Sequence, residues 1–213
     1  WKHPDIRSLS KKLISSECSL RQAAVNVRDW VALHIPYTFQ PTSDRASATL
    51  AKREGMCVNK ANLQVALLRA AGIPAGFVVT SVTRDFYSSI AGNLADLSHI
   101  APVSIHAYCV VYIQESGTFR PFDGTIPAGG SMQLMPDTGE TMASQEVLSG
   151  GQTPAQAEVT VLFMRDNSVS LPQHIREEYN AVIRRIWAEH YGDPNSSNQE
   201  DHARLVQRDE EAA

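Results

Sequence analysis

The first third of the chain is built from segments whose hydrophobic residues recur every three to four positions, the spacing of one helix face. This spacing predicts helices over about residues 6–15, 19–34 and 44–54. We expect Ser19 and Asp44 to cap the second and third of these helices, because their side-chain oxygens can accept hydrogen bonds from the first helical turn.

A longer and more uniformly apolar helix is predicted from Cys57 through Ala71. Gly72 directly after this segment and Pro74 just beyond it are typical helix stop signals. Because apolar residues cover most of its circumference, we expect this helix to be central and buried.

Downstream of this helix the pattern changes to β-branched residues and to the alternation that is typical of strands. Strands are predicted over residues 75–83, 104–113, 118–123 and 158–165. The second and third of these are separated by a short polar turn that contains Gly117, which predicts a β-hairpin.

The remaining segments are of three kinds. Residues 172–191 carry hydrophobic positions at helical spacing and predict an amphipathic helix. Residues 84–102 and 124–157 are mixed or rich in small and polar residues, and they are predicted to be irregular. Residues 193–213 are polar and charged, and we expect a disordered tail.

Composition places the chain among soluble globular proteins with one domain. The 213 residues are 43% hydrophobic and 20% charged, which is enough apolar surface for one substantial core. We expect one domain over residues 1–192, with a core at about 5–127 and an added strand and helix at 158–191.

Several functional classes are disfavoured by charge and hydropathy. The net charge of −4, together with the absence of a basic tract, argues against nucleic acid as a partner. No apolar run approaches the roughly 20 residues of a membrane helix, so no membrane partner is expected. The sequence indicates nothing about the oligomeric state.

The cysteine count bears on the compartment. Cys18, Cys57 and Cys109 form an odd and sparse set, which argues against a disulfide framework and favours a reducing, cytoplasmic compartment. The chain begins at Trp1 rather than Met, so the sequence leaves open whether a targeting segment has been trimmed.

Cys57 is the candidate nucleophile. It follows a turn that contains Gly55 and opens the apolar helix. The first turn of a helix carries unpaired N–H groups and a partial positive charge, which stabilise a thiolate and can hold an oxyanion. The structural alternative is that Cys57 is an inert core residue, the usual role of an unpaired cysteine.

A thiol nucleophile needs a base, and the base needs a partner that fixes its orientation. His106 lies on the predicted strand 104–113, and Asp123 ends the return strand of the hairpin. With a four-residue loop, Asp123 falls opposite Tyr108, and the Cα atoms of His106 and Asp123 are then diagonal neighbours roughly 7–8 Å apart. A three-residue loop would instead put Asp123 on the other face, unless a bulge intervened.

Two other arrangements compete with this one. His99 could serve as the base, although it lies in the segment 84–102 that is predicted to be irregular. A metal site formed by His99, His106 and Cys109 is disfavoured, because His106 and Cys109 would point to opposite faces of one strand. We therefore expect no metal ion and no cofactor.

These residues resemble the transglutaminase-like superfamily. The segment 48–75 is similar to the family's nucleophile motif: a leucine and a basic residue precede Gly-x-Cys57, and the following helix ends Leu-Leu-Arg-Ala-x-Gly-Ile-Pro-Ala. Residues 106–108 resemble its second motif, with Tyr108 where the family usually has Trp. Residues 119–125 resemble its third motif, an aromatic strand that ends in Asp and then Thr.

The resemblance implies an α+β, papain-like fold in which the nucleophile helix packs on an antiparallel β-sheet. It implies Cys57 as nucleophile, His106 as general acid and base, and Asp123 as the residue that orients His106. The implied activity is cysteine-dependent acyl transfer through a thioester acyl-enzyme. The acyl donor would be an amide or thioester on a peptide, a protein or a small molecule, and the acceptor would be water or an amine. The alternative function is a non-catalytic binding or scaffold module that retains the fold.

Overall fold

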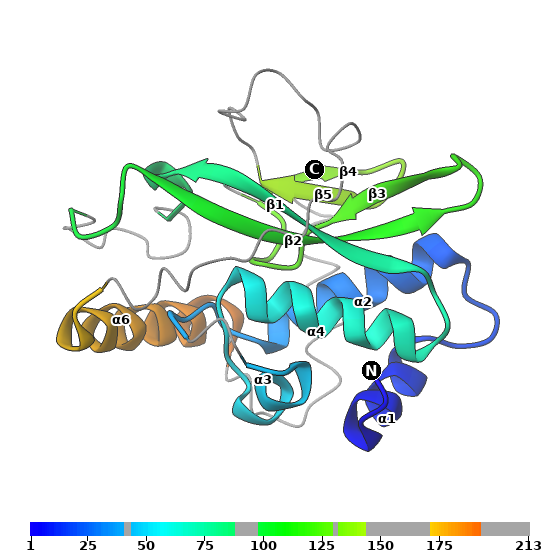
Figure 1. The fold of residues 1–213 in the computed structure, drawn as a ribbon, viewed down its shortest axis with the longest axis horizontal. Coiled ribbons are helices and arrows are strands. Elements are labelled where there is room, and N and C mark those ends of the chain that lie inside the picture. The colour runs from blue at the N-terminus through cyan, green and yellow to red at the C-terminus, as the bar shows by residue number, and fades with distance from the viewer. Residues whose placement is uncertain (41–43, 88–97, 130–131, 144–170, 193–213) are drawn as a thin grey trace.

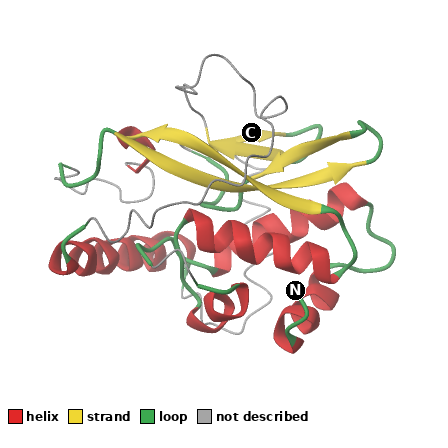
Figure 2. Ribbon diagram, in the orientation of Figure 1, coloured by secondary structure: helices red, strands yellow, loops and turns green. Residues whose placement is uncertain are grey.

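The computed structural model of the chain describes all residues except 41–43, 88–97, 130–131, 144–170 and 193–213. The predicted strand 158–165 and the predicted tail therefore lie outside the described residues. The described residues form two layers, with a twisted five-stranded sheet over a layer of helices (Figures 1 and 2). This is the predicted α+β class.

The first three helices lie close to their predicted positions. They are α1 (Pro4–Leu13), α2 (Leu20–His34) and α3 (Ala46–Lys52). Ser19 caps α2 as predicted, because its hydroxyl accepts a hydrogen bond from the Gln22 N–H at 3.1 Å. The predicted cap of α3 is wrong: Arg45 takes the N-cap position. Asp44 accepts a hydrogen bond from the Lys52 ammonium at 2.6 Å instead, so its carboxylate is used at the other end of the helix.

Helix α4 (Cys57–Ala70) is the central element, as predicted. It contacts α1, α2 and α3 as well as the sheet, and its leucines Leu63, Leu67 and Leu68 are fully buried. Gly72 adopts a φ of 79°, the left-handed conformation that favours glycine after a helix.

The sheet has the strand order β1-β2-β3-β5-β4. Its strands are β1 (Ala75–Thr83), β2 (Val103–Ile113), β3 (Thr118–Phe122), β4 (Met132–Met135) and β5 (Glu140–Ala143). Strands β1, β2 and β3 are antiparallel, and Ile113 pairs with Thr118 across the four-residue loop. The 3-10 helix η1 (Arg84–Tyr87) follows β1.

The prediction that residues 124–157 are irregular is wrong over β4 and β5. These strands have four residues each, too few to show an alternating pattern, and they are stabilised by pairing with distant residues. Strand β5 joins the sheet in parallel beside β3, through Phe122 and Thr141. The turn between β4 and β5 uses Gly139 at a φ of 65°.

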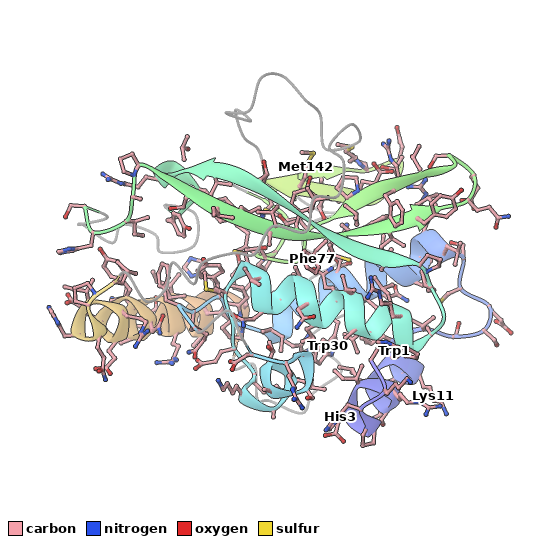
Figure 3. All side chains as sticks on the ribbon, in the orientation of Figure 1. Trp1, His3, Lys11, Trp30, Phe77 and Met142 are labelled. Atoms are coloured by element: carbon pink, nitrogen blue, oxygen red, sulfur yellow. The ribbon has the colours of Figure 1, made fainter. Side chains whose placement is uncertain are left out.

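The main core fills the space between the sheet and α4. Figure 3 shows Phe77 of β1 in this interlayer space, whereas Met142 of β5 lies on the side of the sheet away from the helices. Helix α6 (Gln173–Tyr191) lies beside the N-terminal end of α4 and matches the predicted amphipathic helix (Figure 1). None of the helices in the described ranges has the length and apolar character needed to cross a bilayer.

Candidate active site

Cys57 is the first residue of α4, as predicted, and its side chain is buried. The turn before it is held by two backbone hydrogen bonds, from the Gly55 N–H to Pro36 and from the Thr38 N–H to Gly55. A Cβ atom on Gly55 would lie only 2.7 Å from the Cβ of Asn59, so this close approach requires glycine. The turn therefore fixes the thiol at the helix N-terminus, where free N–H groups concentrate.

His106 and Asp123 form a buried hydrogen-bonded pair. Nε2 of His106 lies 2.6 Å from Oδ2 of Asp123, and both side chains are about 1% exposed. The other carboxylate oxygen, Oδ1, accepts a hydrogen bond from the Thr125 N–H at 2.9 Å. The loop has four residues and Cys109 pairs with Phe122, so the predicted diagonal relation of His106 and Asp123 is confirmed.

The His106 ring packs against two aromatic rings. Phe86 lies 4.9 Å from it and Tyr108 lies 5.9 Å from it, measured between centroids. Nδ1 of His106 is buried and has no hydrogen-bond partner of normal geometry among the described residues. Burial lowers the pKa of His106, but Asp123 and, less strongly, Cys57 outweigh this and raise it to about 10. Cys57 is therefore close enough to the ring to interact with it.

The other predicted candidates stand apart from this group. His99 is exposed in a turn. Cys18 is partly buried near Ser15, with 3.2 Å between Sγ and Oγ. Cys109 is fully buried, and burial raises the pKa of its thiol. No cluster of three His, Cys, Asp or Glu side chains suited to a metal ion occurs among the described residues.

Gln64 connects α4 to the Asp123 segment, a role that the sequence analysis missed. Its Nε2 donates to the Phe122 carbonyl at 3.0 Å, and its Oε1 accepts from the Gly124 N–H at 3.1 Å. A Cβ atom on Gly124 would lie 2.8 Å from Oε1 of Gln64, so glycine allows this contact. A buried glutamine in an apolar helix was the only sequence signal that could have revealed it.

Strand β5 supports the same segment from the other side. The Asp123 N–H donates to the Thr141 carbonyl at 2.8 Å, and the Thr141 hydroxyl donates to the Asp123 carbonyl at 3.3 Å. Arg28 of α2 donates to the Gly139 carbonyl and thereby ties β5 to the helical layer. Asp123 is thus held by its backbone as well as by its side chain.

Lys60 is a second residue that the sequence analysis missed. It lies one turn after Cys57, is fully buried, and donates from Nζ to the Ile35 carbonyl at 2.5 Å. Its ammonium also lies 5.0 Å from the Trp187 ring centroid. Burial lowers the pKa of Lys60 well below its usual value, although Asp123 and Cys57 oppose this. Lys60 therefore lies within electrostatic range of both Cys57 and Asp123.

The candidate site is closed by a cluster of apolar and aromatic side chains that packs around Cys57. Tyr37 contributes a hydroxyl that is buried and lacks a hydrogen-bond partner of normal geometry in the described structure. Burial raises the pKa of Tyr37 well above its usual value, and Tyr87 and Cys57 raise it further. Three residues of α6, Tyr179, Ile183 and Trp187, belong to the same cluster. Cys57 is therefore only 2% exposed, covered by this cluster.

The fold and this site define an α+β protein in which a thiol at a helix N-terminus, Cys57, lies close to the buried His106–Asp123 pair. The family profile of the transglutaminase-like superfamily matches residues 7–124, which is more than half of the chain. The chain belongs to this superfamily, whose members are typically Cys-His-Asp enzymes. The match ends just after Asp123, so β4, β5 and α6 lie beyond it.

Two solved structures are similar in fold. One is a "putative cysteine protease" from Cytophaga hutchinsonii, with 21% identity and a TM-score of 0.44 over 65% of this chain and 41% of that chain. The other is a "putative protease" from Parabacteroides distasonis, with 12% identity and a TM-score of 0.39 over 66% of this chain and 27% of that chain. This chain thus corresponds to less than half the length of either protein. No curated protein sequence matches the chain.

Proposed function

We propose that the protein is a cysteine-dependent acyl-transfer enzyme in which Cys57 is the nucleophile, His106 the general acid and base, and Asp123 the residue that orients His106. The observation that carries the proposal is the buried His106–Asp123 bond of 2.6 Å, with Nδ1 of the same ring unpaired and Cys57 close by. An unpaired buried nitrogen is costly, so its presence next to a thiol supports proton transfer between them.

The chemistry follows from this arrangement. The Cys57 proton is held on His106 as an imidazolium, and the sulfur attacks the carbonyl carbon of an amide or thioester. The leaving amine or thiol takes the proton from His106, and the acyl group remains on Cys57 as a thioester. Water or an amine then gives its proton to His106, attacks the thioester and releases the thiol. Asp123 stabilises the imidazolium in both halves of the cycle.

Alkylation with iodoacetamide at neutral pH, mapped by mass spectrometry, tests the nucleophile. We expect Cys57 to react much faster than Cys18 or Cys109, although Cys18 is the most exposed of the three. Asp123→Asn should slow the reaction at Cys57 at least about tenfold, since the amide does not stabilise a charged imidazole. Cys18 in the same sample serves as the control. Equal rates at all three cysteines would contradict the proposal.

The acyl acceptor is tested with defined donors. Incubation with benzyloxycarbonyl-glutaminyl-glycine, an amide, and phenyl thioacetate, a thioester, should leave a covalent acyl adduct on Cys57 that Cys57→Ser lacks. Hydroxylamine added as the amine acceptor separates the two outcomes. Hydroxamate formed from the amide donor by the wild type but not by Cys57→Ser indicates transfer to amines, whereas free acid formed under the same conditions indicates hydrolysis.

A scaffold module that retains the fold is the second candidate, and the burial of Cys57 favours it. It predicts that Cys57 and Cys109 react equally slowly with iodoacetamide and that Asp123→Asn changes neither rate. The His106–Asp123 pair argues against it, because Nδ1 of the same ring is buried without a hydrogen-bond partner of normal geometry in the described structure, and a purely structural pair gains nothing from that cost.

A further inference from the structure

Helix α6 is attached to the segment that precedes the nucleophile through an unusual pair of hydrogen bonds. The Phe39 N–H donates to Oδ1 of Asn180 at 2.7 Å, and Nδ2 of Asn180 donates to the Phe39 carbonyl at 3.2 Å. Asn180 is only 5% exposed, and Phe39 is also buried. One side-chain amide therefore satisfies both polar groups of one backbone residue.

These two bonds reproduce the pairing between strands. In an antiparallel ladder, two opposite residues exchange both of their N–H···O bonds, and the amide of Asn180 offers one acceptor and one donor to Phe39 in the same way. An extended segment that binds a helix side chain in this manner has an edge suited to a further strand. Recognition of peptides by strand addition uses such an edge.

The opposite edge of this segment is already paired. The Thr38 N–H donates to the Gly55 carbonyl at 3.2 Å, and Tyr37 bridges Gly55 in parallel. The backbone N–H groups of successive residues in an extended chain point to opposite edges, so the Phe39 N–H points away from Gly55 and toward Asn180. The segment 36–39 thus lies between Asn180 and the turn that leads into Cys57. A strand placed where Asn180 now bonds would run alongside the candidate site.

Further contacts hold α6 over the same region. Arg184 forms a bidentate ion pair with Glu54, at 2.8 and 3.0 Å, and Nε1 of Trp187 donates to the Leu33 carbonyl at 3.2 Å. These contacts reach the chain on both sides of the segment 36–39. Displacement of α6 would expose the Phe39 edge and open the cluster around Cys57 in one movement.

We propose that the backbone of Phe39 is the docking edge for an extended peptide that carries the acyl group, and that Asn180 occupies this edge in the resting protein. The proposal rests on the proposed function and names its substrate class: a polypeptide in extended conformation, rather than a compact small molecule. Recognition through main-chain hydrogen bonds makes the docking tolerant of side-chain sequence, while the aromatic cluster sets the preference near the acyl group. The peptide and α6 compete for Phe39, so weaker attachment of α6 raises the apparent affinity for the peptide.

Two matched alkylating peptides test this competition in the full chain. The first is iodoacetyl-tetraalanine amide, and the second is the same peptide with every backbone nitrogen methylated, which removes its hydrogen-bond donors. The measured quantity is the rate of Cys57 modification by each peptide divided by the rate with iodoacetamide. Asn180→Ala should raise this ratio at least about tenfold for the first peptide, because two hydrogen bonds to Phe39 become available. The methylated peptide should change by less than about twofold.

Two further variants separate docking of the peptide at Phe39 from a general loosening of α6. Arg184→Ala removes an anchor of α6 without touching Phe39, and it should raise the ratio for the first peptide only. Arg185→Ala changes an exposed neighbour on the same helix and should leave both ratios unchanged. Equal increases for the two peptides, or no increase with Asn180→Ala, would overturn the docking edge.

Hydrogen exchange at Phe39 tests the edge independently of catalysis. In a Cys57→Ser, Asn180→Ala double variant, the Phe39 N–H should exchange faster than in Cys57→Ser alone. Acetyl-tetraalanine amide at millimolar concentration should slow this exchange again, and its methylated counterpart should not. Unchanged exchange with the peptide refutes the docking edge even if Cys57 is reactive, whereas protection with an unreactive Cys57 refutes only the nucleophile assignment.

Discussion

Gln64 and Asp123 are linked through the backbone: the side-chain amide of Gln64 bonds both peptide groups that flank the carboxylate residue. Gln64 lies seven residues after Cys57 on α4, about two helical turns away. The nucleophile and the anchor of the acid therefore share one rigid helix. The distance between Cys57 and Asp123 is set by this helix rather than by the flexibility of a loop.

Gln64→Leu should weaken both stability and reactivity. The change removes the buried Gln64 hydrogen bonds to the Phe122 carbonyl and the Gly124 N–H, so the free energy of unfolding should fall by about 1–3 kcal/mol in urea denaturation. Cys57 alkylation should slow at least about tenfold, because His106 loses a fixed partner. Gln173→Leu, at an exposed position of α6, is the control and should affect neither quantity appreciably. Unchanged alkylation in a folded Gln64→Leu variant would argue against this positioning role.

The glycine before the nucleophile should not accept a side chain. Gly55→Ala places a Cβ atom 2.7 Å from the Cβ of Asn59, in a helix that cannot easily move, and should cost about 1–3 kcal/mol of stability. Gly76→Ala is the matched control, because its Cβ atom would meet Val110 at an ordinary 3.9 Å. Thermal unfolding of both variants provides the comparison, and equal melting temperatures would show that the turn relaxes.

The buried Glu140 should be important for the strand that supports Asp123. Its carboxylate binds Arg21 at 2.8 Å and binds Arg120 through two nitrogens, with 1% exposure of the glutamate. Glu140→Gln leaves two arginines without a negative partner and should lower the free energy of unfolding by about 1–3 kcal/mol. Glu189→Gln breaks an exposed helix pair with Arg185 and should cost less than about 0.5 kcal/mol. Similar losses in the two variants, measured in urea, would contradict this account.

The pH dependence of stability should report the His106–Asp123 pair. The folded-state pKa of His106 is raised to about 10, because Asp123 and Cys57 outweigh burial, whereas the unfolded value is about 6.5. The stability that the protonated His106 contributes is therefore fully present below pH 6.5 and is lost as the pH rises toward 10. The stability difference between the wild type and His106→Gln should shrink by at least about 1 kcal/mol over this interval.

Urea denaturation at several pH values measures this difference. His99→Gln, at an exposed position, is the control, and its curve should run parallel to that of the wild type. A constant difference between wild type and His106→Gln would mean that the histidine does not carry the expected proton.

Local sequence patterns predicted most of the framework. The helix from Cys57 was predictable because apolar residues, a glycine turn and a glycine–proline stop all agree over a short stretch. The hairpin was predictable from its short polar turn, whereas the choice between a four-residue and a three-residue loop, which fixes the diagonal relation of His106 and Asp123, was decided by the structure. In each case the determining residues are neighbours in the chain, so their physical preferences can be read without knowing the fold.

Only the tertiary structure decided how this framework is joined and covered. The Gln64 bonds to the Asp123 segment, the pairing of β5 beside β3 and the Asn180 bonds to Phe39 connect residues 18 to 141 positions apart. A polar side chain in an apolar helix has many possible partners in a sequence, and the one that it binds depends on which segments the packed core brings within hydrogen-bond distance. The sequence therefore determined the longer elements and the candidate residues, whereas long-range packing determined the short strands β4 and β5, the supports of the site and its covering by α6.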